Sequence, residues 1–233
     1  GSNLHVSTIH GTKKDISPFE KTDFIFGASQ KSLAKISSKN SVVLENWVDE
    51  SRFNNFSKSE SEYFLFLGRF EPVKNPKRLI NAWKGIKHRL LMVGEGVLKN
   101  EMQNLIEDLN LSNQISIKPE TNNVAALFSN AKALLIPSDR EGSPKVLFES
   151  LYCNVPVLST KCGIMSDLLP PNSLAETNDN NFKDLITDWV DNLHELETIQ
   201  EICFKKVKEE NLLSVQAEKV NRIYQDLFSK ASK

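Results

Sequence analysis

Two acidic residues eight positions apart, Glu141 and Glu149, span the junction of a polar loop and a helix. Gly142 gives the loop backbone freedom and lets a ligand approach closely, and Pro144 is typical of a first helical turn. The free N–H groups and partial positive charge at the start of a helix bind anions. We expect the free amides near Ser143, Lys145 and Val146 to point toward the side of the loop where a ligand would bind. The segment therefore predicts a site where carboxylates bind sugar hydroxyls and amides bind phosphate.

A plainer interpretation is that the same segment carries ordinary surface charges. Lys145 and Glu149 are spaced i, i+4 and would form a solvated ion pair, and Glu141 would be only a loop acid. We favour the functional interpretation because Glu149 is set among the apolar residues of 146–153, in a helix that leads into a buried strand. A carboxylate in such surroundings should have a partner.

A second set of candidates is cationic. Gly68, Arg69 and Lys74 follow the continuous apolar run 63–67, which predicts a strand buried on both faces. Arginine suits phosphate oxygens through its planar geometry and lysine through its point charge. The alternative is a solvated basic loop. The shared location with the anion-binding helix start favours a phosphate site.

The elements that must position these residues alternate regularly along the chain. Apolar runs predict strands at 63–67, 90–93, 114–117, 133–136 and 155–158, with a weaker strand at 173–175. Helical patterns lie between and after them, and one begins with Asn75 as N-cap and Pro76 in its first turn. This alternation predicts an α/β fold, a Rossmann-like parallel sheet with helices on both faces. Ligands bind such sheets beyond the carboxyl ends of the strands, where the candidate loops lie.

Composition bounds the class of protein. The 233 residues are 39% hydrophobic and 25% charged, which fits an ordinary globular protein with a full core. A formal net charge of -1 gives no bulk attraction to nucleic acid, so no nucleic-acid partner is expected. Three irregularly spaced cysteines indicate a reducing compartment and hence the cytoplasm. No apolar run approaches the ~20 residues that span a bilayer.

Other cofactor chemistry has weak support. Gly94 and Gly96 resemble the start of a dinucleotide fingerprint, but Lys99 stands where the third glycine belongs. A tight strand-to-helix turn explains both glycines without a ligand. No paired aspartates stand in a suitable loop, and no Walker loop or nucleophile elbow is present. We therefore expect neither a metal nor another cofactor.

The segments 64–83, 91–96 and 137–160 together resemble the C-terminal domain of family 4 (group 1) retaining glycosyltransferases. That family has the GT-B architecture, in which two Rossmann-like domains enclose the active site. The resemblance implies that Arg69 and Lys74 bind the donor diphosphate, that Glu149 binds the ribose and that Glu141 lies near the transferred sugar. The implied donor-binding set is Gly68, Arg69, Lys74, Lys118, Pro119, Glu141, Gly142, Ser143, Lys145, Val146 and Glu149. The loop after Thr160 departs from the family pattern, because Cys162 replaces the first of two glycines.

The first segment resembles the end of the family's N-terminal domain. The run 6–11 resembles a strand that ends in an active-site histidine, which makes His10 a catalytic candidate, although a lone histidine can also be incidental. Trp47 replaces the glycine of an Asn-Gly-Val-Asp turn. We predict residues 1–53 as a remnant of the acceptor-side domain, 54–61 as a linker, 62–212 as the nucleotide-sugar-binding domain and 213–233 as a helix that crosses back. Gly1 and Ser2 look like the remains of a tag.

The activity implied by this resemblance is sugar transfer, with retention, from a nucleotide-diphosphate sugar to a glycan or lipid-linked acceptor. The implied catalytic residues are Glu141, Arg69, Lys74 and His10, and the cations and helix dipole replace a metal. Polysaccharide or cell-envelope biosynthesis is the expected setting, at the inner face of a membrane if the absent half makes peripheral contact. This piece alone is expected to be inactive. The alternatives are a nucleotide-sugar epimerase of the same architecture and a non-catalytic nucleotide-binding subunit.

Overall fold

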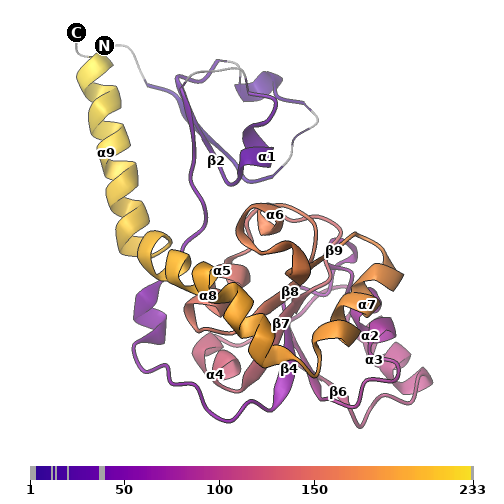
Figure 1. Ribbon diagram of the computed structural model, residues 1–233. Helices are drawn as coiled ribbons and strands as arrows, with labels where there is room; N and C mark the ends of the chain where they lie inside the picture. Colours follow the sequence, from indigo (N-terminus) through magenta and orange to yellow (C-terminus); the bar gives the residue numbers. More distant parts are fainter. Residues whose placement is uncertain (1–3, 12, 14, 20, 37–39, 232–233) are drawn as a thin grey trace.

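The computed structural model describes residues 4–11, 13, 15–19, 21–36 and 40–231, so Gly1 and Ser2 lie outside the described part. The chain forms a small unit and a larger unit, each built on a parallel sheet (Figure 1). The small unit contains β1 (Val6–Ile9), η1 (Ser17–Phe19), β2 (Phe24–Gly27), α1 (Gln30–Leu33) and β3 (Ser41–Val43). The two units are joined by the segment after β3 and by the long C-terminal helix α9 (Leu213–Ala231).

The larger unit alternates strands and helices. Its strands are β4 (Tyr63–Leu67), β5 (Leu90–Val93), β6 (Ile115–Lys118), β7 (Ala131–Ile136), β8 (Val157–Thr160) and β9 (Leu174–Ala175). Its α-helices are α2 (Pro76–Ala82), α3 (Lys99–Asp108), α4 (Val124–Ser129), α5 (Lys145–Tyr152), α6 (Met165–Leu168), α7 (Asp179–Trp189) and α8 (Leu193–Glu210). Its single-turn helices are η2 (Glu50–Phe53), η3 (Pro72–Lys74) and η4 (Pro171–Ser173).

The six strands of the larger sheet lie in the order β6-β5-β4-β7-β8-β9, and the pairings between them are parallel. From β4 the chain winds outward through β5 to β6, then returns to β7 and winds the other way through β8 to β9. The winding direction therefore reverses between β4 and β7. Such a reversal leaves a crevice at the carboxyl ends of the two central strands, where ligands of this fold class bind.

Two hydrophobic cores lie on opposite faces of this sheet. On one face, Leu65 and its neighbours pack against α4, α5 and α8. On the other face, Phe64 and Phe66 pack against α2, α3 and α7, with Trp83 fully buried among them. Figure 1 shows these two helix layers on either side of the strands. Because successive strand residues point to opposite faces, a strand that is apolar throughout, such as β4, supplies both cores.

The predicted fold class is confirmed, and the predicted strand 63–67 matches β4 residue for residue. Asn75 caps α2 through its side chain, which accepts a hydrogen bond from the Arg78 amide at 3.1 Å, and Pro76 follows in the first turn. Strand β8 begins at Val157, two residues later than we predicted. Pro156 has no N–H to donate to a neighbouring strand, so regular pairing begins after it.

The junction between the units differs from the predicted boundary. Val48 and Phe53 are buried in the core of the larger unit, and the Val48 amide donates to the Asn211 carbonyl at 2.8 Å. Packing therefore groups residues 48–53 with the larger sheet, whereas we assigned them to the first segment. Helix α9 runs beside the small unit, where the Tyr224 ring lies 6.2 Å from the Phe26 ring (Figure 1). Phe228, near the end of α9, is 58% exposed.

Candidate functional site

Lys74 and Glu141 meet beyond the carboxyl ends of β4 and β7. The Lys74 Nζ lies 2.7 Å from Oε1 and 2.8 Å from Oε2 of Glu141. The Ser138 hydroxyl also donates to Glu141 Oε1, at 2.6 Å. The two loops are tied by their backbones, because the Asp139 amide donates to the Val73 carbonyl at 2.9 Å. The structure thus brings together one predicted acid and one predicted cation at the point where the winding of the sheet reverses.

The start of α5 lies against the segment that joins the two units. Ser143 is buried, and its hydroxyl accepts a hydrogen bond from the Asn46 amide at 3.2 Å. The Asn46 side-chain amide donates to the Ser143 carbonyl. Gly142 lies directly against the His10 carbonyl, so that a Cβ at this position would overlap it. The structure therefore places His10 beside the Glu141 loop, through its backbone.

Glu149, the second predicted acid, is buried and forms an ion pair with Arg52 of η2. The Arg52 Nη1 donates to Glu149 Oε1 at 3.1 Å. Burial raises the pKa of Glu149, while the charges of Arg52 and Lys145 act in the opposite direction. The expectation that this acid has a partner is met by a residue that we did not single out. Nothing in the polar run around Arg52 signals this role.

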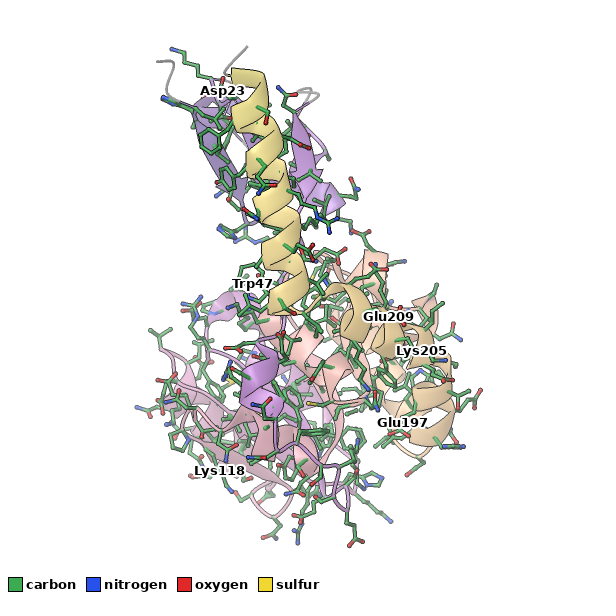
Figure 2. The ribbon with its side chains drawn as sticks, turned by 90° about the vertical axis from the view of Figure 1, so that its left-hand side faces the viewer. Asp23, Trp47, Lys118, Glu197, Lys205 and Glu209 are labelled. Atoms are coloured by element: carbon green, nitrogen blue, oxygen red, sulfur yellow. The ribbon has the colours of Figure 1, made fainter. Side chains whose placement is uncertain are left out.

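Lys145 does not form the alternative i, i+4 ion pair in the described contacts, since its ammonium lies 5.3 Å from the centre of the Trp47 ring. A cation over an aromatic face is attracted by the ring quadrupole. Figure 2 shows Trp47 at the junction of the two units, and it shows Lys118 far from it at the other end of the larger unit. Lys118 and Pro119 are exposed. The structure does not bring these two residues to the start of α5.

Arg69 points to solvent. Its side chain is 70% exposed and pairs with Glu71 in the same loop. Gly68 precedes it, and the Gly68 carbonyl lies against Gly94, whose φ of 152° and lack of a side chain allow this approach. Arg69 thus follows β4, as predicted, but its described partner is Glu71 and not a member of the Lys74–Glu141 pair.

Arg78 is a buried residue of the loop network that we did not select. Its guanidinium contacts Asp139, Asp179 and two backbone carbonyls. A signal was available in the sequence, because Arg78 lies one helical turn before the apolar Ala82 on α2. A buried arginine requires partners, and both acids follow strands at the same edge of the sheet.

Neither Lys74 nor Glu141 lines any of four clefts formed by the described residues. A cleft of about 690 Å³ lies at the opposite end of α5, between Cys153, Phe56 and α8. Within the described residues, no group of three or more His, Cys, Asp or Glu side chains is arranged to hold a metal ion. In the same part of the chain, no helix is both long and apolar enough to cross a bilayer.

The profile of the family described as Glycosyl transferases group 1 matches residues 48–202, more than half of the chain. The chain belongs to this family. An uncharacterised glycosyltransferase of Methanocaldococcus jannaschii is 28% identical to it over 156 residues, which are 65% of this chain and 44% of that protein. The N-acetylgalactosamine-N,N'-diacetylbacillosaminyl-diphospho-undecaprenol 4-alpha-N-acetylgalactosaminyltransferase of Campylobacter jejuni is 30% identical over 154 residues, 61% of this chain and 42% of that enzyme. The group 1 chain therefore spans less than half the length of these relatives.

Solved structures share the fold of this group 1 chain. HepE of Anabaena, in complex with UDP, superposes with a TM-score of 0.80 at 15% identity over 95% of this chain and 72% of that one. Sucrose-phosphate synthase of Thermosynechococcus elongatus gives a TM-score of 0.80 at 18% identity, over 92% of this chain and 60% of that one. The predicted half of a GT-B fold is thereby confirmed.

Proposed function

We propose that this chain is the donor-binding half of a retaining glycosyltransferase that takes a sugar from a nucleoside-diphosphate sugar. The observation that carries the proposal is the Lys74–Glu141 pair at the reversal between β4 and β7. Parallel sheets of this order bind ligands at that point. The pair combines a point charge for phosphate with a carboxylate for hydroxyl groups.

The proposed roles follow from position and charge. Lys74 stabilises the negative charge that develops on the leaving diphosphate, together with the backbone amides at the start of α5. Glu141 accepts hydrogen bonds from hydroxyls of the transferred sugar, since its two oxygens offer more acceptor sites than Lys74 and Ser138 occupy. Glu149 binds the ribose, and Arg69 approaches the diphosphate from the solvent side. We propose no metal for this reaction.

Related proteins support the substrate class. HepE has been solved with UDP and also with UDP-glucose, and the Staphylococcus aureus protein TarM with UDP and alpha-GlcNAc-glycerol. The name of the Campylobacter jejuni relative places its acceptor on diphospho-undecaprenol, a lipid carrier. A Salmonella typhimurium relative, 27% identical, is an O-antigen chain mannosyltransferase. By this analogy the whole protein transfers sugar to a glycan or lipid-linked acceptor in cell-envelope or polysaccharide assembly.

Calorimetric titration of the chain with UDP, GDP and ADP tests the donor site. We expect one of the three to bind best, and we expect Lys74→Met, Glu149→Ala and Arg69→Ala each to weaken that binding by about fivefold or more, as for lost charge-assisted contacts. Lys77→Met is the matched control, because Lys77 is an exposed lysine on α2, close in sequence to Lys74. Equal affinity in all variants, or no binding of any nucleotide, contradicts the assigned site.

The reaction itself is tested on the whole protein with the radiolabelled nucleotide sugar of the best base. Transfer of label to an acceptor with the same anomeric configuration supports a retaining transferase. Conversion of the sugar without an acceptor supports the epimerase alternative. Binding with neither transfer nor hydrolysis supports a non-catalytic subunit.

A further inference from the structure

The Arg78 guanidinium joins three loops at the carboxyl edge of the sheet. Its Nε donates to Asp179 Oδ1 at 2.8 Å, at the start of α7. Its Nη1 donates to the Pro137 carbonyl at 2.7 Å, and its Nη2 lies 2.8 Å from Asp139 Oδ1. Nη2 also donates to the Thr177 carbonyl, at 3.3 Å. Arg78 lies on α2, which follows the loop after β4, and its side chain contacts the loops after β7 and β9. One side chain therefore connects all three loops.

This network contacts the two loops that carry Lys74 and Glu141. Asn75, the residue after Lys74, donates its side-chain amide to Asp139 at 3.3 Å. Asp139 lies two residues before Glu141, and its carboxylate forms an ion pair with the Arg78 guanidinium. Each member of the pair is therefore within two residues of a group that the network fixes. Arg78 is only 5% exposed, so it acts through these loops and does not reach a ligand in the crevice.

The chemistry of the residue fits a positioning role better than a stabilising one. Taking a charge out of water is unfavourable, and a well-packed apolar side chain of similar volume is often at least as stabilising. Ala82, four residues on along the same face of α2, is apolar and buried, so this face accepts an apolar side chain. What an apolar residue lacks is the planar fork of donors, which fixes several acceptors at set angles.

We propose that Arg78 is a positioning residue of the donor site, which sets the place of loop 137–142 and so the approach of Glu141 to Lys74. The inference rests on the proposed donor-binding function for its affinity readout. A displacement of about 1 Å in a supporting loop can lower the effectiveness of a site by up to about a hundredfold. The position of this loop is therefore expected to appear in ligand affinity as well as in stability.

The first test compares Arg78→Met with Lys77→Met, its exposed neighbour on α2, in calorimetric titrations with UDP, GDP and ADP. We expect Arg78→Met to weaken the best nucleotide by about tenfold, and Lys77→Met by less than about twofold. In a Lys74→Met background, Arg78→Met should weaken binding by less than about threefold, because the approach of Glu141 to Lys74 that it sets is already lost. Equal loss in both backgrounds indicates a role that is only structural and overturns the proposal.

The second test needs no ligand and separates this inference from the proposed function. The Asp139 amide bonds the Val73 carbonyl across the two loops, so its hydrogen exchange reports their relative position. We expect this exchange to be about tenfold faster in Arg78→Met, with the amides of β4 and β7 unchanged. Unchanged exchange at Asp139 overturns the proposal whether or not a nucleotide binds.

A further variant serves if Arg78→Met does not fold. Asp179 is largely exposed on the first turn of α7, so Asp179→Ala removes one arm of the network and leaves the buried charge paired with Asp139. We expect a smaller change in the same direction, about threefold in nucleotide affinity and in Asp139 exchange. No change in either quantity overturns the proposal.

Discussion

Replacing Arg52 by methionine leaves the carboxylate of Glu149 buried without its nearest cation. The side chain of Glu149 is 7% exposed and that of Arg52 is 40% exposed, with 3.1 Å between Nη1 and Oε1. Methionine keeps much of the length of the arginine side chain and removes the charge. The variant therefore isolates the electrostatic contribution of the pair, which joins η2 to α5.

The magnitude follows from the distance and the exposure. At 3.1 Å, two unit charges attract by about 5 kcal/mol at an effective dielectric of 20 and by about 1 kcal/mol in water. The half-exposed arginine places the pair between these limits, and side-chain ordering lowers the net contribution. We expect Arg52→Met to lower the free energy of unfolding at pH 7.5 by about 2 kcal/mol, which is about 5 °C in melting temperature for a chain of this size.

The effect should depend on pH with a definite sign. The folded-state pKa of Glu149 is raised above its usual 4.5 by burial, so the native protein holds this proton more tightly than the unfolded chain. The group's contribution to stability then falls as pH rises from 4.5 through the folded pKa, and Arg52 limits that fall. The difference between wild type and Arg52→Met should therefore be small near pH 4.5 and reach its full size near neutral pH.

Urea unfolding of wild type, Arg52→Met, Glu149→Gln and the double variant gives the coupling free energy of the pair. Arg222→Met is the matched control, since Arg222 pairs with Glu218 in an exposed i, i+4 contact on α9 and should contribute less than about 0.5 kcal/mol. A coupling below about 0.5 kcal/mol for Arg52 and Glu149 at pH 7.5 would refute the reasoning. The same coupling at pH 4.5 as at pH 7.5 would refute it too.

Three further outcomes follow from close packing and burial. Gly142→Ala should lower the free energy of unfolding, measured by chemical denaturation, by about 1–3 kcal/mol, because the added Cβ meets the backbone of His10. The control Gly11→Ala should change it by less than about 0.5 kcal/mol, because the added Cβ there meets open space. Gly94→Ala should lower it by at least about 2 kcal/mol in the same assay, since φ is 152° and a backbone carbonyl occupies the space. Burial raises the pKa of Cys153 to about 12, so a thiol reagent at about pH 8 should label this cysteine only after denaturant is added.

The fold was predictable because its signals are local. The apolar run of β4 is buried on both faces, and the pair Asn75–Pro76 specifies a helix start whichever residues pack on the helix. The strand order was not predictable, because no local sequence pattern indicates that β7 pairs with β4 on the side opposite to β5. The boundary at residue 48 was also missed. Val48 stands between Trp47 and Asp49, and only its packing in the larger core and its contact with Asn211 show where it belongs.

The site was predictable as far as the strand ends determine it. Lys74 and Glu141 each follow a strand of a parallel sheet, so the sequence places both at the same sheet edge. That they meet depends on β4 and β7 being neighbours, which only the structure shows. The direction in which a side chain points could not be predicted in this way. Arg69 follows the same strand as Lys74 and pairs with Glu71 instead. The partner of Glu149 lies 97 residues away in a segment without a helical or strand period, so sequence spacing could not identify it.

The two acids of one short motif are held by different parts of the chain. Glu141 is held within the larger unit by Lys74 and Ser138, whereas Glu149 is held by Arg52, close in the chain to the segment that joins the two units. A ligand that hydrogen-bonds Glu149 in place of Arg52 weakens the attachment of that segment. By linkage, a change that moves the segment away alters the affinity of Glu149 for the ligand by the same factor. On the proposed function, binding at Glu149 is therefore coupled through Arg52 to the junction of the units, while the Glu141 loop meets the small unit through the contact of Gly142 with the His10 carbonyl.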